Sequence, residues 1–188
     1  MDIDKAINER HSVRSFKKEK KPTYQDIMVA IESATKAPLA GNIEAVKYIL
    51  VSDKDKIREL ATAAQQNFIG DVAYVLVVCS DRKDVDKLYY ERAKMYGHQQ
   101  AGAAIENFML KLIDLGLSTC WIGAFSDETV RRILNIPDNI VVEALLPIGY
   151  EMGKGKQKRK PSLDDVVFYD TWKNRFMKPR RMVLGSQT

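Results

Sequence analysis

Two arginines flank a serine near the start of the chain, in the run RHSVRSF at residues 10–16. A guanidinium group can donate two parallel hydrogen bonds to phosphate oxygens, and a hydroxyl group can add a third. A phosphate monoester carries close to two negative charges at neutral pH, so a pair of cations suits it. Arg10, Ser12 and Arg14 are therefore candidate phosphate ligands. The same spacing is equally typical of solvated arginines at the end of a helix, and the pattern alone leaves both interpretations open.

A second candidate site is the turn APLAGN at residues 37–42. Small side chains allow a backbone to approach a flat ligand closely, and the Asn42 amide offers both a donor and an acceptor. An ordinary turn between a helix and a strand has the same composition, so this pattern too has two interpretations.

The self-contained catalytic signatures are absent from the sequence. It contains no GxSxG, HExxH, CxxC, GxxxxGK[ST] or GxGxxG motif. With 2 histidines in the chain, we predict no metal site. Cys79 and Cys120 lie in apolar runs, as is typical of buried free thiols in a reducing compartment. No apolar run reaches the ~20 residues of a membrane span, and the N-terminus has no apolar signal segment, so we expect a cytoplasmic protein without membrane contact.

The elements that must position these residues alternate along the chain. Helices are expected over 3–10, 24–37, 53–66, 84–115 and 126–134, with a break near Gly97 in the fourth. Thr23, Asp53 and Ser126 are the expected N-caps of the second, third and fifth helices. Strands are expected at 47–51, 72–79, 119–125 and 140–150, and the apolar run at 72–79 is typical of a strand covered on both faces. This order predicts a layered α/β or α+β domain.

The net charge of +5 comes from the C-terminal part of the chain. Residues 151–188 carry 10 Lys and Arg against 4 Asp and Glu, whereas residues 1–150 carry 20 against 21. A basic segment of this kind could bind nucleic acid, a membrane surface or one anionic ligand, or only be solvated. No zinc-finger, KH or RNP pattern accompanies it, so nucleic acid is not an expected partner. Residues 151–162 read as an exposed connection.

Together these motifs resemble the nitroreductase family of FMN-dependent oxidoreductases over about residues 3–170. The resemblance rests on RHSVRSF (10–16), APLAGN (37–42), AGAAIENFMLKLIDLGLSTCWIGAF (101–125), LPIGY (146–150) and KRKPSLDDVV (158–167). It implies an α+β fold with a central, mostly antiparallel sheet flanked by helices, and a C-terminal segment that extends onto a partner subunit. We therefore expect a nitroreductase-like FMN-binding domain at 1–170 and a basic C-terminal extension at 171–188.

The resemblance also implies a homodimer that holds FMN at the subunit interface. The implied contacts of the FMN phosphate are Arg10, the backbone of His11, Ser12, Arg14, Lys158 and Arg159. The implied contacts of the flavin ring and its ribityl chain are Pro38, Leu39, Ala40 and Asn42 from the partner subunit, with Gln66, Ile122, Gly123, Pro147 and Gly149. In place of the serine common in the family this chain has Leu39, and Glu44-Ala45-Val46 replaces a Gln-Pro-Trp-like run. These departures alter how FMN is seated.

The implied activity is hydride transfer from NADH or NADPH, through flavin N5, to an organic acceptor such as a nitroaromatic compound or a quinone. Such an enzyme works by ping-pong turnover and needs no catalytic side chain. Tyr89, Tyr90 and Tyr96 either stack on the acceptor or only cover the core. The alternatives are another flavin chemistry on the same scaffold, namely reductive dehalogenation or flavin fragmentation, or a flavin- or anion-binding protein without turnover.

Overall fold

The computed structural model describes residues 2–153, 155 and 158–177, and it divides into two compact units, residues 1–157 and 158–188. The first unit is built on a four-stranded sheet in the order β1-β2-β4-β3. Its strands are β1 (Val46–Val51), β2 (Tyr74–Ser80), β3 (Ser118–Thr119) and β4 (Val141–Gly149). Every neighbouring pair is antiparallel, which confirms the expected α+β class.

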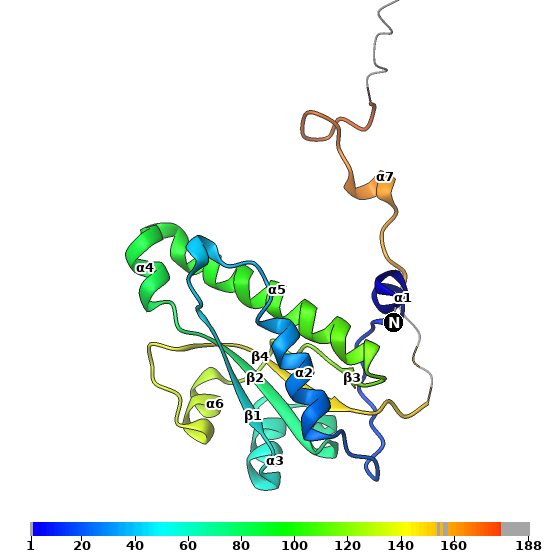
Figure 1. Cartoon of the computed structure of the whole chain (residues 1–188), viewed down its shortest axis with the longest axis vertical. Coiled ribbons are helices and arrows are strands. Elements are labelled where there is room, and N and C mark those ends of the chain that lie inside the picture. Colours follow the sequence, from blue (N-terminus) through cyan, green and yellow to red (C-terminus); the bar gives the residue numbers. More distant parts are fainter. Residues whose placement is uncertain (1, 154, 156–157, 178–188) are drawn as a thin grey trace, which may run out of the picture. The chain divides into compact units, whose positions relative to one another are not determined.

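Helices cover both faces of the sheet (Figure 1). On one face lie α2 (Tyr24–Ala34) and the long α5 (Ala93–Asp114), and α1 (Ile3–Glu9) packs against α5. On the other face lie α3 (Lys54–Ala63) and α6 (Asp127–Leu134). The remaining helix of this unit, α4 (Lys83–Tyr89), leads into α5, and short 3₁₀ turns occur at Ala40–Asn42, Asn67–Asp71 and Tyr90–Arg92.

The strand β2 lies between β1 and β4 and is buried on both sides. Leu76 and Val78 pack into the core beneath α2 and α5, whereas Val75 and Val77 pack into the core beneath α3 and α6. All four side chains are fully buried. The expectation of a strand covered on both faces is therefore confirmed, because side chains alternate between the faces of a sheet.

The predicted helix starts are confirmed. The side chains of Thr23, Asp53 and Ser126 each accept a backbone N–H from the first turn, at 3.1, 2.9 and 3.4 Å respectively. Such a bond satisfies one of the N–H groups that a helix leaves unpaired at its start. The predicted C-terminus of the second helix is wrong, because α2 ends at Ala34 rather than at residue 37.

The helical region 84–115 breaks at Tyr90 and not near Gly97. Tyr90 separates α4 from α5 with φ 45° and ψ −116°, a backbone conformation that favours glycine. Gly97 lies inside α5, where a Cβ atom would be 2.7 Å from Cδ of Arg82. The glycine thus allows close packing of Arg82 and does not interrupt the helix.

The expected strand at 119–125 is also corrected. Only Ser118 and Thr119 pair with β4 as a strand, and Ile122 returns for a single bridge to Leu145. Between them the backbone leaves the edge of β4, and the Trp121 side chain is 42% exposed. Within the apolar run, therefore, only Thr119 belongs to a strand and Ile122 forms an isolated bridge, and the rest is a loop.

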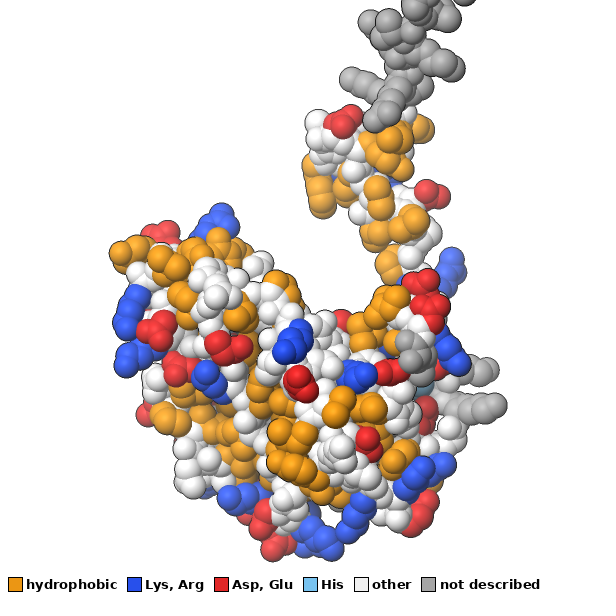
Figure 2. Space-filling model, viewed as in Figure 1, with side chains coloured by type: hydrophobic (Ala, Val, Ile, Leu, Met, Phe, Trp, Pro, Cys, Tyr) orange, Lys and Arg blue, Asp and Glu red, His pale blue; other side chains and the backbone are white. Residues whose placement is uncertain are grey.

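The second unit has few contacts of its own. It contains the short helix α7 (Leu163–Val166), begun by a capping box between Ser162 and Asp165, and the rings of Phe168 and Trp172 pack edge to face at 4.7 Å. Most of its large apolar side chains are exposed, and hydrophobic groups dominate its surface in Figure 2. They are Leu163, Val166, Val167, Trp172, Phe176 and Met177. Part of the predicted extension at 171–188 lies outside the described residues.

Candidate functional site

The segment with the candidate phosphate ligands lies against the ends of two strands. It leaves α1 at Arg10, whose backbone is extended (φ −61°, ψ 122°). The N–H of Val13 then donates to the carbonyl of Thr119 at 3.0 Å, and Phe16 forms a β-bridge with Glu151. Segment 10–16 is thus fixed between the loop after β3 and the end of β4, which are more than 100 residues further along the chain.

Ser12 and Arg14 lie together beside the loop after β3. Both face the thiol of Cys120: burial raises the pKa of that thiol, and the Arg14 charge and the Ser12 hydroxyl act against this rise. Both side chains are exposed, and no carboxylate of the described residues forms an ion pair with Arg14. An exposed guanidinium beside a hydroxyl is a suitable contact for an anion.

Arg10 lies on the side of α5. Its Nε is 3.3 Å from Oε1 of Glu106, and its side chain is 21% exposed. Glu106 lies inside α5, so its ion pair fixes the position of the first arginine of the segment. Nothing in the sequence had pointed to Glu106.

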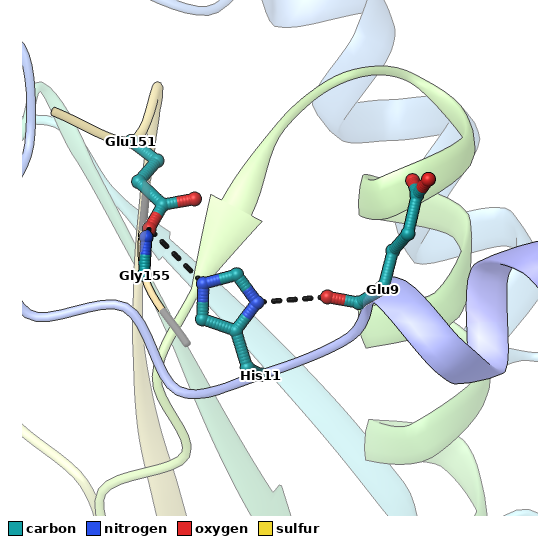
Figure 3. Close-up of polar contacts among 4 residues, drawn as sticks. All are labelled: Glu9, His11, Glu151 and Gly155. Carbon is teal, nitrogen blue, oxygen red and sulfur yellow. Dashed lines mark hydrogen bonds and ion pairs between the residues drawn. The ribbon is translucent and has the colours of Figure 1, made fainter. Parts of the chain in front are cut away.

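His11 points in another direction (Figure 3). Its Nδ1 lies 2.8 Å from the carbonyl oxygen of Glu9, and its Nε2 lies 3.0 Å from Oε1 of Glu151. The hydrogen bonds to Glu151 and to the Glu9 carbonyl raise the pKa of His11 above its usual value, and partial burial and Arg10 act against this. Because Glu151 is 140 residues away in sequence, no local pattern had indicated this contact.

The residues predicted beside the flavin ring fall into two groups. Ile122 and Gly123 lie in the loop after β3, close in sequence to Cys120. Ile122 is buried and exchanges two backbone hydrogen bonds with Leu145, at 3.1 and 3.0 Å. Gly123 is exposed, and a Cβ atom there would meet nothing within 4 Å. The loop therefore has open space directly over Gly123, three residues after the Cys120 thiol that Ser12 and Arg14 face.

Pro147 and Gly149 lie inside the sheet instead. Pro147 pairs with Val75 of β2, and Gly149 pairs with Ser118 of β3. A Cβ atom on Gly149 would be 2.8 Å from the ring of Phe16, so this glycine allows Phe16 to pack. Gln66 is half-buried at the start of the 3₁₀ turn after α3. Lys158 and Arg159 belong to the second unit. The flavin contacts assigned to these residues stay predictions.

The structure brings the second candidate turn together with two of the predicted tyrosines. A cavity of about 370 Å³ is lined by Pro38, Leu39, Ala40, Tyr89, Tyr96, Gln99, Gln100 and Ala103. The rings of Tyr89 and Tyr96 pack edge to face at 4.9 Å. Gly41, with φ +59°, lies under Tyr89, and a Cβ there would be 2.7 Å from the tyrosine oxygen. Tyr90 lies outside this cavity and is 80% exposed, and Asn42 is not among the lining residues.

Gln100 is a polar residue of this cavity that sequence reasoning missed. It is 4% exposed, and neither of its amide atoms has a hydrogen-bond partner among the described residues. A buried unpaired amide destabilises the fold, so its presence beside the tyrosines points to a polar ligand group or a bound water. The other lining side chains carry no charge, so the cavity suits a neutral ligand.

Within the described part of the chain, no cluster of three or more His, Cys, Asp or Glu side chains could hold a metal ion. In the same residues no helix is both long and apolar enough to cross a bilayer.

Comparison with known proteins gives a consistent result. The model of the nitroreductase family matches residues 7–71 and 61–150. An FMN reductase (NADPH) of Bacillus subtilis is 27% identical over 188 residues, which cover 92% of this chain and 74% of that protein. An iodotyrosine deiodinase of Thermotoga neapolitana is 24% identical over 179 residues, covering 87% of this chain and 95% of that protein.

Solved structures show the same fold. Nitroreductase A of Vibrio parahaemolyticus superposes with a TM-score of 0.83 at 19% identity, covering 93% of this chain and 78% of that one. An NADPH:FMN oxidoreductase of Vibrio harveyi, complexed with NAD+, gives a TM-score of 0.83 at 22% identity and covers 92% of this chain and 78% of that one. Because the family model accounts for most of the sequence and these structures share its fold, the chain belongs to the nitroreductase family.

Proposed function

We propose that the chain is an FMN-dependent NAD(P)H oxidoreductase that acts as a homodimer on a neutral organic acceptor. The observation that carries this proposal is the pair formed by Ser12 and Arg14, which lies exposed beside Cys120 with no carboxylate of the described residues bound to the guanidinium. The names of the relatives support it, since they include an FMN reductase that uses NADPH and an NADPH:FMN oxidoreductase in complex with NAD+.

The residues of the site fit a flavin mononucleotide. The phosphate carries close to two negative charges, and Arg10, Ser12 and Arg14 supply two guanidinium groups and a hydroxyl. The open space over Gly123 leaves room for a flat ring against the backbone of the loop after β3. Family resemblance implies that Lys158 and Arg159 also contact the phosphate, and this assignment stays a prediction.

When bound, FMN accepts a hydride from a nicotinamide and passes it to the second substrate. The chain's own residues bind and orient the cofactor and shape the site for the acceptor. The cavity of Tyr89 and Tyr96 is the proposed acceptor site, because its aromatic and amide groups suit a flat, uncharged molecule. Pro38, Leu39 and Ala40 line the same cavity, which supports a role for the second candidate turn in binding the acceptor.

A flavin spectrum tests the cofactor and the donor together. We expect purified protein to take up FMN, and its visible flavin absorbance to bleach when NADH or NADPH is added without oxygen. Adding a quinone or a nitroaromatic compound should restore the absorbance. A protein that does not take up FMN would contradict the proposal. A protein that binds FMN but is never reduced by either nicotinamide would indicate a binding protein without turnover.

The acceptor needs its own assay, because one relative is an iodotyrosine deiodinase. The reduced protein should be offered a quinone, a nitroaromatic compound and an iodinated phenol, and products should be identified by mass spectrometry. We expect the quinone or the nitroaromatic compound to be reduced fastest. Release of iodide as the main reaction would replace our proposal with reductive dehalogenation on the same scaffold.

A further inference from the structure

The side chain of His11 lies in a network that the FMN phosphate would not touch. The three hydrogen bonds of this network join Nδ1 of His11 to the carbonyl of Glu9 (2.8 Å), Nε2 of His11 to Oε1 of Glu151 (3.0 Å), and the N–H of Gly155 to the same Oε1 (2.7 Å). Figure 3 shows the imidazole between the end of α1 and the residues after β4. The histidine thus joins two elements on either side of segment 10–16.

Both ring nitrogens of His11 face oxygen acceptors. A neutral imidazole has one N–H and one lone pair, so it can donate to only one of the two oxygens. Only the protonated ring donates to the Glu9 carbonyl and to the Glu151 carboxylate at once. The complete network therefore requires the imidazolium form of His11.

Gly155 shows that the network is closely packed. A Cβ atom at this position would lie 2.5 Å from Oε1 of Glu151 and 2.5 Å from Nε2 of His11. Any other residue would force the Glu151 carboxylate, the His11 ring or the backbone to shift. The side chain of His11 is 19% exposed and that of Glu151 is 22% exposed, so water screens this pair only in part.

The described groups around His11 favour its protonated form. The Glu151 carboxylate comes from the end of β4, and the Glu9 carbonyl comes from the last residue of α1. The side-chain carboxylate of Glu9 lies 3.8 Å from Nζ of Lys5. The neighbouring residue Arg10 carries a positive charge that acts against protonation of His11. A cavity beside His11 is also lined by the cation Lys17 and by Tyr150. The residues that line it from α5, from β3 and from the turn between them are uncharged: Ile113, Gly116, Leu117 and Ser118.

The backbone on either side of His11 carries the proposed phosphate ligands. Ser12 and Arg14 both face Cys120, whereas the ring of His11, one residue before Ser12, faces Glu9 and Glu151. Val13 is buried, and its N–H is bonded to Thr119. Between α1 and Val13, the hydrogen bonds of His11 and the ion pair of Arg10 with Glu106 therefore hold the backbone from which Ser12 extends.

We propose that His11 is a positioning residue for the FMN phosphate, and that its imidazolium holds segment 10–14 between Glu9 and Glu151 so that Ser12 and Arg14 face the phosphate together. This inference rests on the proposed function, because it takes the segment to be the phosphate site. When the ring loses its proton, one of the two hydrogen bonds is lost and the segment is held at one end only. FMN then binds more weakly, whereas riboflavin, which has no phosphate, is unaffected.

The test compares the binding of FMN and riboflavin by wild-type protein and by His11→Gln between about pH 5.5 and 8.5. The affinity ratio of wild type to variant cancels the titration of the FMN phosphate itself, which has a second pKa near 6. For FMN we expect a ratio of about ten at low pH, equivalent to ~1.4 kcal/mol, which is close to the lower end of the range for a hydrogen bond to a charged group. It should fall toward one as the pH rises past the pKa of His11, above about 6.5. For riboflavin the ratio should stay near one throughout.

Two further variants make the test specific. Glu151→Gln keeps an acceptor but removes the charge that favours the imidazolium. The ratio of FMN affinities with and without His11, measured in this variant, should therefore begin to fall at a lower pH. His98→Gln is the matched control, because His98 is the other histidine of the chain and is bound to Glu143 at 2.8 Å in a different part of the fold. It should leave the pH dependence of FMN binding unchanged.

Two outcomes would overturn the inference. One is an FMN ratio that does not change with pH, and the other is an equal loss of riboflavin, which would show that His11→Gln disturbs the whole site. A wild-type protein that binds neither flavin would refute the proposed function itself, and the inference with it, so the two failures are distinguishable.

Discussion

Two glycines predicted beside the flavin ring have very different surroundings, and their variants should behave differently. Gly149→Ala would place a Cβ 2.8 Å from the ring of Phe16, whereas Gly123→Ala would meet nothing within 4 Å. Overpacking of this kind costs about 1–3 kcal/mol, so Gly149→Ala should lower the free energy of unfolding measured in urea. Gly123→Ala should unfold like wild type but bind FMN more weakly, because its methyl group would fill the space proposed for the ring.

The control for this pair is Gly70→Ala, which also meets nothing within 4 Å and was not assigned to the flavin site. It should change neither stability nor FMN affinity. Full FMN affinity in Gly123→Ala would remove that loop from the proposed site, and normal stability of Gly149→Ala would contradict the packing described for Phe16.

Removing the guanidinium of Arg14 should weaken FMN binding with little effect on folding. The group is exposed and binds no carboxylate of the described residues, so Arg14→Ala leaves no buried partner unpaired. A lost hydrogen bond to a charged group costs about 1.5–3 kcal/mol, which corresponds to roughly 10- to 150-fold in the dissociation constant. Fluorescence titration with FMN and with riboflavin measures the effect, and only FMN should be affected.

The matched control is Arg58→Ala, which removes an exposed arginine of α3 that is paired with Asp55 at 2.9 Å. This variant should bind FMN normally. Equal FMN affinity in Arg14→Ala and Arg58→Ala would mean that the phosphate lies elsewhere.

Among the helices, the break between α4 and α5 has the clearest consequence for the stability of the fold. Tyr90 adopts φ 45° and ψ −116°, which is unfavourable for any residue with a Cβ, and its side chain is 80% exposed. Backbone strain of this kind costs about 1–3 kcal/mol. Tyr90→Gly should therefore raise the unfolding temperature, because it removes the strain and loses almost no packing.

Tyr90→Phe is the control for this prediction, since it keeps the strained backbone and removes only the hydroxyl group. It should melt like wild type. A lower unfolding temperature for Tyr90→Gly would show that the tyrosine stabilises the break through contacts not seen in the single chain. A change in KM for the acceptor in both variants would instead assign Tyr90 to the acceptor site, which is one of the two roles that the sequence left open.

The elements that were predicted correctly have local causes. The helix starts at Thr23, Asp53 and Ser126 follow from a capping side chain, and the central strand follows from a continuous apolar run. The predictions were wrong where tertiary contacts, rather than the local sequence, determine the structure. Gly97 lies inside a helix, where the lack of a side chain allows Arg82 to pack over it, and the apolar run at 119–125 leaves the sheet after Thr119. Neither fact has a signal within a few residues.

The candidate site shows the same division. The motif at 10–16 identified Arg10, Ser12 and Arg14 as possible ligands, since their chemistry is local. The partners of this segment could not be predicted from the sequence, because Glu106, Thr119 and Glu151 contact it only in the folded chain. The unpaired amide of Gln100 was hidden for a related reason: its spacing in α5 fits a core position equally well.

For the molecule as a whole, the exposed apolar side chains of the second unit predict a partner surface. Trp172 is 79% exposed and Phe176 82%, although such side chains are usually buried in a monomer. We expect the full chain to sediment as a homodimer, with twice the mass of 21.4 kDa. Trp172→Asp should shift the protein toward monomer, because a charge replaces a large apolar contact, and it should weaken FMN binding if the flavin lies between subunits.

Thr171→Asp is the control, since it adds the same charge one residue away without removing an apolar side chain. It should leave the dimer intact. A wild-type chain that sediments as a monomer while holding FMN would contradict the homodimer, although it would leave the phosphate segment in place.

The pairing of residues 13–17 with residues 119 and 150–152 also bears on how the protein is made. The N–H groups of Val13 and Lys17 donate to the carbonyls of Thr119 and Tyr150, and the N–H of Met152 donates to Ser15. During synthesis on the ribosome the N-terminal segment emerges first, yet its set of backbone partners is complete only when residue 152 has left the exit tunnel. Truncated nascent chains that stop before this point should not retain FMN, so cofactor loading must follow translation of most of the polypeptide.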